Sequence, residues 1–71
     1  MDKHTERIKE YAKSMIYNAE QIIKELDQSA ETENLVFALN KFGSIEQTAG
    51  EAGNYVTDLY FNKNSSGIGI I

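Results

Sequence analysis

Two apolar rows repeat every seven residues through the second half of the chain, and this pattern limits the possible folds more than any other feature. The rows consist of these eight residues: Leu35, Phe42, Ala49 and Val56, then Ala38, Ile45, Ala52 and Leu59. An offset of three residues between two such rows is the a/d spacing of a helix that packs along its whole length. The pattern therefore predicts a helix over residues 30–62, with these eight residues as its oligomer or partner interface.

Three glycines leave two alternatives open for this helix. Gly43 and Gly50 are seven residues apart beside the apolar rows, and Gly53 is close to them. Each glycine disfavours a helix by about 1 kcal/mol relative to alanine. Either a closely packed partner offsets this loss, or the helix breaks near Gly43 or Gly50–Gly53.

An earlier helix is expected over residues 3–27, where one stripe follows the 3.6-residue helical period. The stripe consists of Ile8, Ala12, Met15, Ile16, Ala19, Ile22, Ile23 and Leu26. Asp2 or Thr5 can act as its N-cap. Residues 27–32 have the polar composition of a turn, with Ser29 and Thr32 as caps for the next helix, although one continuous helix is the alternative. We expect an all-α chain that forms an antiparallel two-helix hairpin.

The end of the chain changes composition. Residues 62–67 are rich in Asn, Ser and Gly, which is typical of turns and loops. We therefore expect a single hairpin domain at 1–62 and a C-terminal tail at 63–71. The tail ends in an apolar group that is expected to dock on another surface: Ile68, Ile70 and Ile71.

The small size of the chain predicts self-association. A chain of 71 residues is near the size at which folding buries only about 60% of the unfolded surface, so a monomeric core is marginal. Chains this small are usually stabilised by disulfides, a metal or further copies. The absence of cysteine excludes disulfides, and His4 is the only histidine. We therefore expect hairpins to assemble into a helical bundle as a homo-oligomer.

Charge and hydropathy exclude several partners. The net charge is −4, and residues 14–58 carry eight carboxylates against Lys24 and Lys41. Direct nucleic-acid binding needs a clustered positive surface, so it is not expected. Apolar runs are too short to cross a bilayer, and the N-terminus lacks the apolar segment of a signal peptide. We expect no membrane partner and a cytoplasmic location.

Catalysis is not expected either. Cysteine nucleophiles are impossible without cysteine, and His4 falls in a first helical turn, where fraying is common. The Glu-x-x-His motifs of di-iron bundles do not occur. The sequence therefore predicts no catalytic residue, no metal site and no cofactor.

These observations favour a self-associating helical module, a regulatory or inhibitory protein of bacterial or phage origin that binds a partner protein stoichiometrically. The alternative is an oligomer that sequesters a small ligand such as a nucleotide signal. Its possible ligand contacts are Tyr11, Tyr17, Asn40 and Lys41. A weaker alternative is an acidic inhibitor that mimics DNA.

Overall fold

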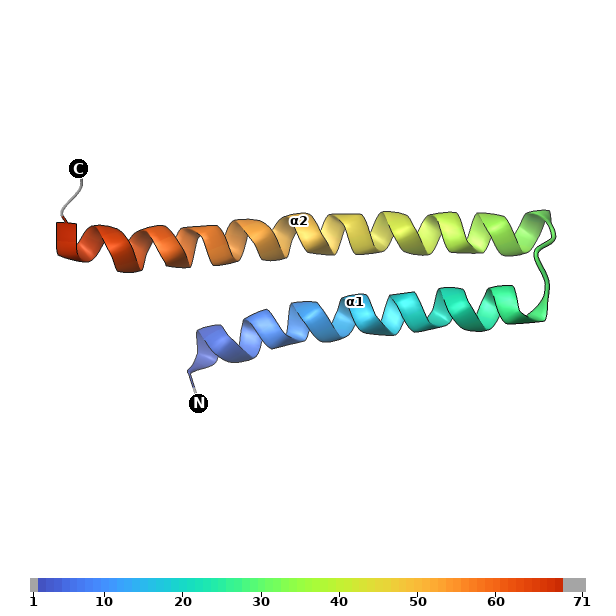
Figure 1. The fold of residues 1–71 in the computed structure, drawn as a ribbon, viewed down its shortest axis with the longest axis horizontal. Helices are drawn as coiled ribbons and strands as arrows, with labels where there is room; N and C mark the ends of the chain where they lie inside the picture. Colours follow the sequence, from blue (N-terminus) through green and yellow to red (C-terminus); the bar gives the residue numbers. More distant parts are fainter. Residues whose placement is uncertain (1, 69–71) are drawn as a thin grey trace.

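The protein is a two-helix antiparallel hairpin in the computed structural model, which describes the backbone of residues 2–68 and the side chains of residues 2–63. Helix α1 spans Lys3–Gln28 and helix α2 spans Thr32–Ile68. The helices lie side by side, and α2 extends past the start of α1 (Figure 1). The described part of the chain contains no strand. The expected all-α hairpin is thus confirmed.

The hairpin is an elongated slab one helix thick. Its principal extents are 55 × 26 × 11 Å, and its radius of gyration is 17.0 Å. A compact domain of this length would have a radius of gyration of about 11 Å. Every residue therefore lies close to one of the two broad sides of the slab.

The N-cap of helix α1 is Asp2, one of the two residues predicted for this position. The Asp2 carboxylate accepts a 2.9 Å hydrogen bond from the backbone N–H of His4, and the Asp2 carbonyl accepts one from Glu6 at 3.1 Å. Side-chain capping of this kind satisfies a backbone donor that has no partner within the helix. Thr5 lies inside the first turn instead. At the other end, Ser29 adopts an extended conformation and its N–H bonds to the carbonyl of Glu25.

The turn at 29–31 separates the helices, so the alternative of one continuous helix is wrong. The predicted caps were Ser29 and Thr32, but the structure uses Asn34. The Asn34 side-chain oxygen accepts a 3.0 Å hydrogen bond from the backbone N–H of Glu31. This is the arrangement in which a residue three positions into a helix bonds back to its N-cap.

Helix α2 is continuous through Gly43, Gly50 and Gly53, so of the two alternatives the break does not occur. A Cβ added at any of these glycines would have no heavy atom within 4 Å besides the local helix backbone. Packing within the hairpin therefore does not require glycine there. The helix also continues to Ile68, where loop was predicted from residue 62. No proline interrupts it, and extending a formed helix is easier than starting one.

The helices pack along a seam whose members recur at alternating intervals of three and four residues. In α1 the seam consists of Ile8, Tyr11, Met15, Asn18, Ile22 and Glu25, and in α2 of Asn34, Ala38, Lys41, Ile45, Thr48, Ala52, Tyr55 and Leu59. All are buried or half-buried, and Ile22 and Ala38 form the core of the described residues together with the polar Asn34. This spacing is that of helices packing knobs into holes.

The seam contains only one of the two rows predicted from the heptad pattern. Ala38, Ile45, Ala52 and Leu59 pack towards α1, so within a protomer they belong to the hairpin itself. The other row is exposed, and it consists of Leu35, Phe42, Ala49 and Val56. The division follows from geometry, because each exposed residue comes one position after a seam residue and one position turns an α-helix by about 100°. The seam residues in question are Asn34, Lys41, Thr48 and Tyr55.

Candidate functional site

Exposed apolar side chains form a surface that we call the apolar face. It consists of Ala12, Ile16, Ile23 and Leu26 from α1, and of Leu35, Leu39, Phe42, Ala49 and Val56 from α2. The seven larger side chains are between 38% and 69% exposed. Leu39 at 69% and Ile23 at 60% are the most exposed of the seven. Clustered exposure on this scale is typical of an interaction surface.

The two helices contribute to the same broad side of the slab. Each residue of the apolar face directly follows a seam residue, as Ile16 follows Met15 and Phe42 follows Lys41. One step along an α-helix turns by about 100° in a fixed sense. Because α1 and α2 run in opposite directions, this turn brings both rows to the same side of the hairpin.

The opposite side of the slab is mostly polar. Its residues directly precede the seam residues, and they include Glu10, Ser14, Gln21, Lys24, Asn40, Ser44, Gln47, Glu51, Asn54 and Asp58. The hairpin as a whole is therefore amphipathic across its 11 Å thickness. An amphipathic element in water buries its apolar side against another element.

The exposed area of the chain is large for its mass. The accessible surface is 5436 Å². A compact monomer of 8.0 kDa would expose about 4,450 Å². The difference of about 1,000 Å² slightly exceeds the share of about 800 Å² that one partner buries in a standard protein interface. The chain as a whole thus exposes an excess of surface about as large as one partner's share of an interface.

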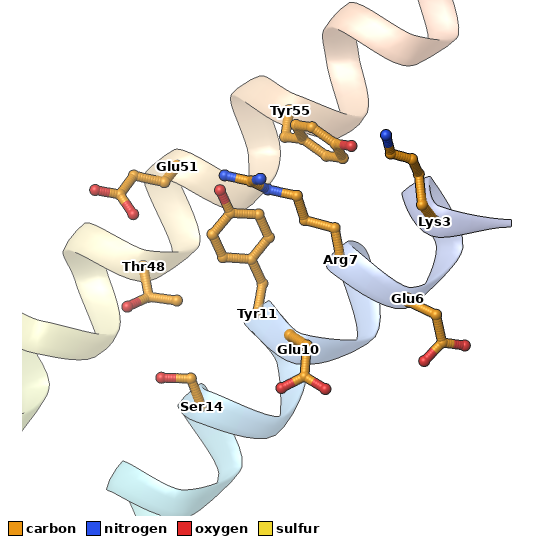
Figure 2. A pocket seen from close by; sticks show the side chains of 9 residues that line it. All are labelled: Lys3, Glu6, Arg7, Glu10, Tyr11, Ser14, Thr48, Glu51 and Tyr55. Atoms are coloured by element: carbon orange, nitrogen blue, oxygen red, sulfur yellow. The ribbon is translucent and has the colours of Figure 1, made fainter.

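A pocket opens on the polar side near the free ends of the helices, with a volume of about 650 Å³. Its lining residues are Lys3, Glu6, Arg7, Glu10, Tyr11, Ser14, Thr48, Glu51 and Tyr55. Figure 2 shows the guanidinium group of Arg7 between the rings of Tyr11 and Tyr55. It lies 5.8 Å from the centroid of Tyr11 and 5.2 Å from that of Tyr55, both within the range of cation–π attraction.

Tyr55 is the residue of α2 that holds this end of the hairpin together. Its hydroxyl is 2.5 Å from Nδ1 of His4, and its ring centroid is 6.1 Å from that of Tyr11. His4, Arg7 and Tyr11 of α1 therefore all contact the side chain of Tyr55. Hydrogen bonding to Tyr11 raises the pKa of Arg7 above its usual value.

The charge balance of the pocket is mixed. Lys3 and Arg7 supply two cations, and Glu6, Glu10 and Glu51 supply three carboxylates. A site built for phosphate would have an excess of cations. The arrangement can hold the two helices together at this end. It can also bind a polar ligand whose aromatic ring stacks on tyrosine.

The predicted ligand contacts lie apart from one another. Tyr11 lines the pocket, whereas Tyr17, Asn40 and Lys41 do not. Tyr17 is 60% exposed on α1, and the ammonium group of Lys41 lies 5.4 Å from the ring centroid of Phe37. The residues missed by sequence reasoning are Arg7 and Tyr55, which come together only once the register of the hairpin is known.

Three remaining points concern the C-terminal tail, membrane spans and metal sites. Ile70 and Ile71 of the predicted docking group lie outside the described residues, and only the backbone of Ile68 is described. Over the portion of the chain that the structure describes, no helix is long and apolar enough to cross a membrane. The same portion holds no group of three or more His, Cys, Asp or Glu side chains arranged to bind a metal ion.

Comparison of the chain with protein-family models, with curated proteins and with solved structures finds no match.

Proposed function

We propose that the protein is a non-enzymatic interaction module that associates with itself through the apolar face and binds a partner protein stoichiometrically. The observation that carries the proposal is the apolar face itself, which both helices build on one side of the slab. A second copy of the same hairpin offers a surface of matching size and chemistry. Pairing two such faces produces a four-helix bundle with the apolar side chains in its centre.

The marginal size of the protomer supports this proposal. Only Ile22 and Ala38 are buried apolar residues within the described hairpin. A chain with so small a core gains most of its stability from burial against another copy. Folding and association would then be a single process, as is common for obligate dimers.

The polar sides of the slab stay on the outside of such a bundle and are available to a partner protein. Residues 14–58 carry a net charge of −6, so these outer surfaces are acidic over most of their length. A partner with a basic surface would be attracted by them, and salt would weaken its binding. By covering the basic surface of such a partner, the protein would regulate or inhibit it.

The test is the substitution Ala49→Glu, which places a charge in the middle of the apolar face. Gln47→Glu is the matched control, since it adds the same charge on the polar side only two residues away. Light scattering of the unaltered protein should give at least twice the chain mass of 8.0 kDa. Ala49→Glu should lower this mass to that of one chain and reduce helicity, and Gln47→Glu should leave both unchanged. A mass unaffected by Ala49→Glu would disprove the proposal.

A second candidate function rests on the pocket at the free ends of the helices. Its volume of about 650 Å³ lies within the range of about 300–1,000 Å³ that small-molecule sites occupy. Tyr11 and Tyr55 offer stacking surfaces, and Arg7 offers hydrogen-bond donors. This arrangement favours a ring-bearing polar ligand sequestered by the oligomer. A nucleotide is the ligand to test, and Lys3 and Arg7 would have to hold its phosphate against the three carboxylates of the pocket.

A thermal-shift screen with nucleotides separates this candidate from the first. A ligand that binds only the folded form raises the melting temperature, by an amount that grows with its concentration. The shift should disappear in Tyr11→Ala and persist in Tyr17→Ala, because Tyr17 does not line the pocket. If no nucleotide raises the melting temperature, the second candidate is rejected and the protein-binding module stands alone.

A further inference from the structure

The two contacts that fix the ends of the hairpin also fix its register. Glu25 contacts Asn34 beside the turn, and His4 contacts Tyr55 at the free ends. In both contacts the two residue numbers add to 59, so a residue of α1 lies level with the residue of α2 that completes this sum. Ile16 is then level with Gly43, one residue from Phe42, and all positions along the slab can be assigned in the same way.

The apolar face is uneven along the length of the slab. The half beside the turn is apolar in both helices, with Ile16 and Ile23 on α1 opposite Phe42 and Leu35 on α2. In the half beside the free ends, the α1 residue that follows the seam residue Ile8 is Lys9, and the half-buried residue one turn before it is Thr5. The α2 positions that follow seam residues in this half are Gly53 and Val56, with the larger Tyr60 only at the outer end, beside Thr5.

From this asymmetry we infer that the second copy packs with its turn at the same end, so that α1 of one protomer lies over α2 of the other. This inference rests on the proposed self-association and specifies its geometry. A two-fold axis along the slab places equal levels over one another. Large residues then meet large ones, with Ile16 over the partner's Phe42, and small residues meet small ones, with Ala12 over the partner's Ala49. Every helix is also antiparallel to both of its neighbours.

The opposite-end arrangement leaves the same side chains badly matched. With the two α1 helices fully overlapped, it would place Ile23 over the half of the partner that presents Thr5 and Lys9. Sliding the copies until only the apolar halves overlap would leave residues 50–63 without a cover. The same-end bundle avoids both problems, because each part of the apolar face packs on the part of the partner at the same distance from the turn.

A distance measurement between two copies of one label tests the inference. The chain has no cysteine, so Ala30→Cys in the exposed turn introduces a single attachment site for a nitroxide. Helices in contact are about 8–10 Å apart, so the same-end bundle should give a label separation below about 25 Å. Full overlap of the α1 helices in the opposite-end arrangement separates the turns by about the length of α1, which is 26 residues or about 39 Å at 1.5 Å per residue.

The outcomes distinguish this inference from the proposed function. A dimer with a separation below about 25 Å supports both, and a dimer with any longer separation overturns the geometry alone. A labelled protein with the mass of one chain and no intermolecular signal overturns the proposed self-association as well. Gln28→Cys, at the exposed end of α1, repeats the measurement in case the turn does not tolerate the label. Adding Ala49→Glu to the labelled chain should remove the short separation.

Discussion

The side-chain amide of Asn34 donates a 2.8 Å hydrogen bond to Oε2 of Glu25, and this contact joins the end of α1 to the start of α2. Asn34 is only 8% exposed, and its oxygen accepts from the backbone N–H of Glu31. One buried amide thus uses its donor across the turn and its acceptor within the turn. Because buried polar groups must be satisfied, this pair of bonds specifies where α1 stops and α2 begins.

Replacing Asn34 by alanine should destabilise the protein by about 1–2 kcal/mol. The substitution removes the acceptor of the Glu31 N–H and leaves the Glu25 carboxylate without its donor. Urea unfolding at a fixed protein concentration measures the change. Asn40→Ala is the control, since Asn40 is exposed on the polar side of α2 and its loss should change stability by less than about 0.5 kcal/mol.

A second pair of variants isolates the contact with Glu25. Asn34→Asp keeps an acceptor for Glu31 but faces a carboxylate with a carboxylate, so it should be as destabilising as Asn34→Ala or more so. Adding Glu25→Gln restores a donor across the turn and should recover part of the loss. Additive effects of the two substitutions, with no coupling, would show that the two side chains do not interact in solution.

The sequence predicted the helices well because their periodic signals are long. The α1 stripe runs from Ile8 to Leu26 and the heptad rows of α2 from Leu35 to Leu59, and no proline interrupts them. It did not predict that Leu35 and Phe42 would turn away from α1 while Lys41 and Thr48 would lie in the seam. Hydrophobicity alone would place the larger apolar residues inside. A lysine stem can cover apolar surface while its charge stays in water, so polar residues can occupy a narrow seam.

The pocket could not be predicted for a different reason. Arg7 and Tyr55 are 48 positions apart, and their contact depends on the register between the helices. That register is set by a turn of three residues and by Asn34, whose role as a cap is a tertiary feature. A turn one residue longer would bring Arg7 to a different residue of α2.

Replacing Gly43 by alanine should stabilise the protein by up to about 1 kcal/mol per chain, because Gly43 lies in an uninterrupted helix. An added Cβ there meets no heavy atom within 4 Å, so no steric cost offsets the gain. Thermal unfolding followed by circular dichroism should show a rise of several degrees. A fall would mean that α2 bends at Gly43 in solution or that another chain packs against it.

The melting temperature should depend on protein concentration if the apolar face is covered by another copy. Raising the concentration from 1 to 100 µM should stabilise the folded dimer by about 2.7 kcal/mol and raise its melting temperature by about 5–10 °C. The measurement is a series of thermal scans at constant buffer. Phe42→Lys should abolish the dependence by lowering the affinity of the apolar face. A sharp transition at one temperature, whatever the concentration, would identify a stable monomer.

Tyr55→Ala should loosen the free ends of the hairpin while leaving the turn intact. The substitution removes the ring that Arg7 and Tyr11 contact and the hydroxyl that lies beside His4, and we expect a loss of about 1–2 kcal/mol. Hydrogen exchange should accelerate in residues 3–11 and remain slow in residues 20–40, since local opening follows local contacts. Tyr55→Phe keeps the ring and should lose much less. If both variants accelerate exchange equally over the whole chain, the cluster around Tyr55 is not a local fastening of the two helices.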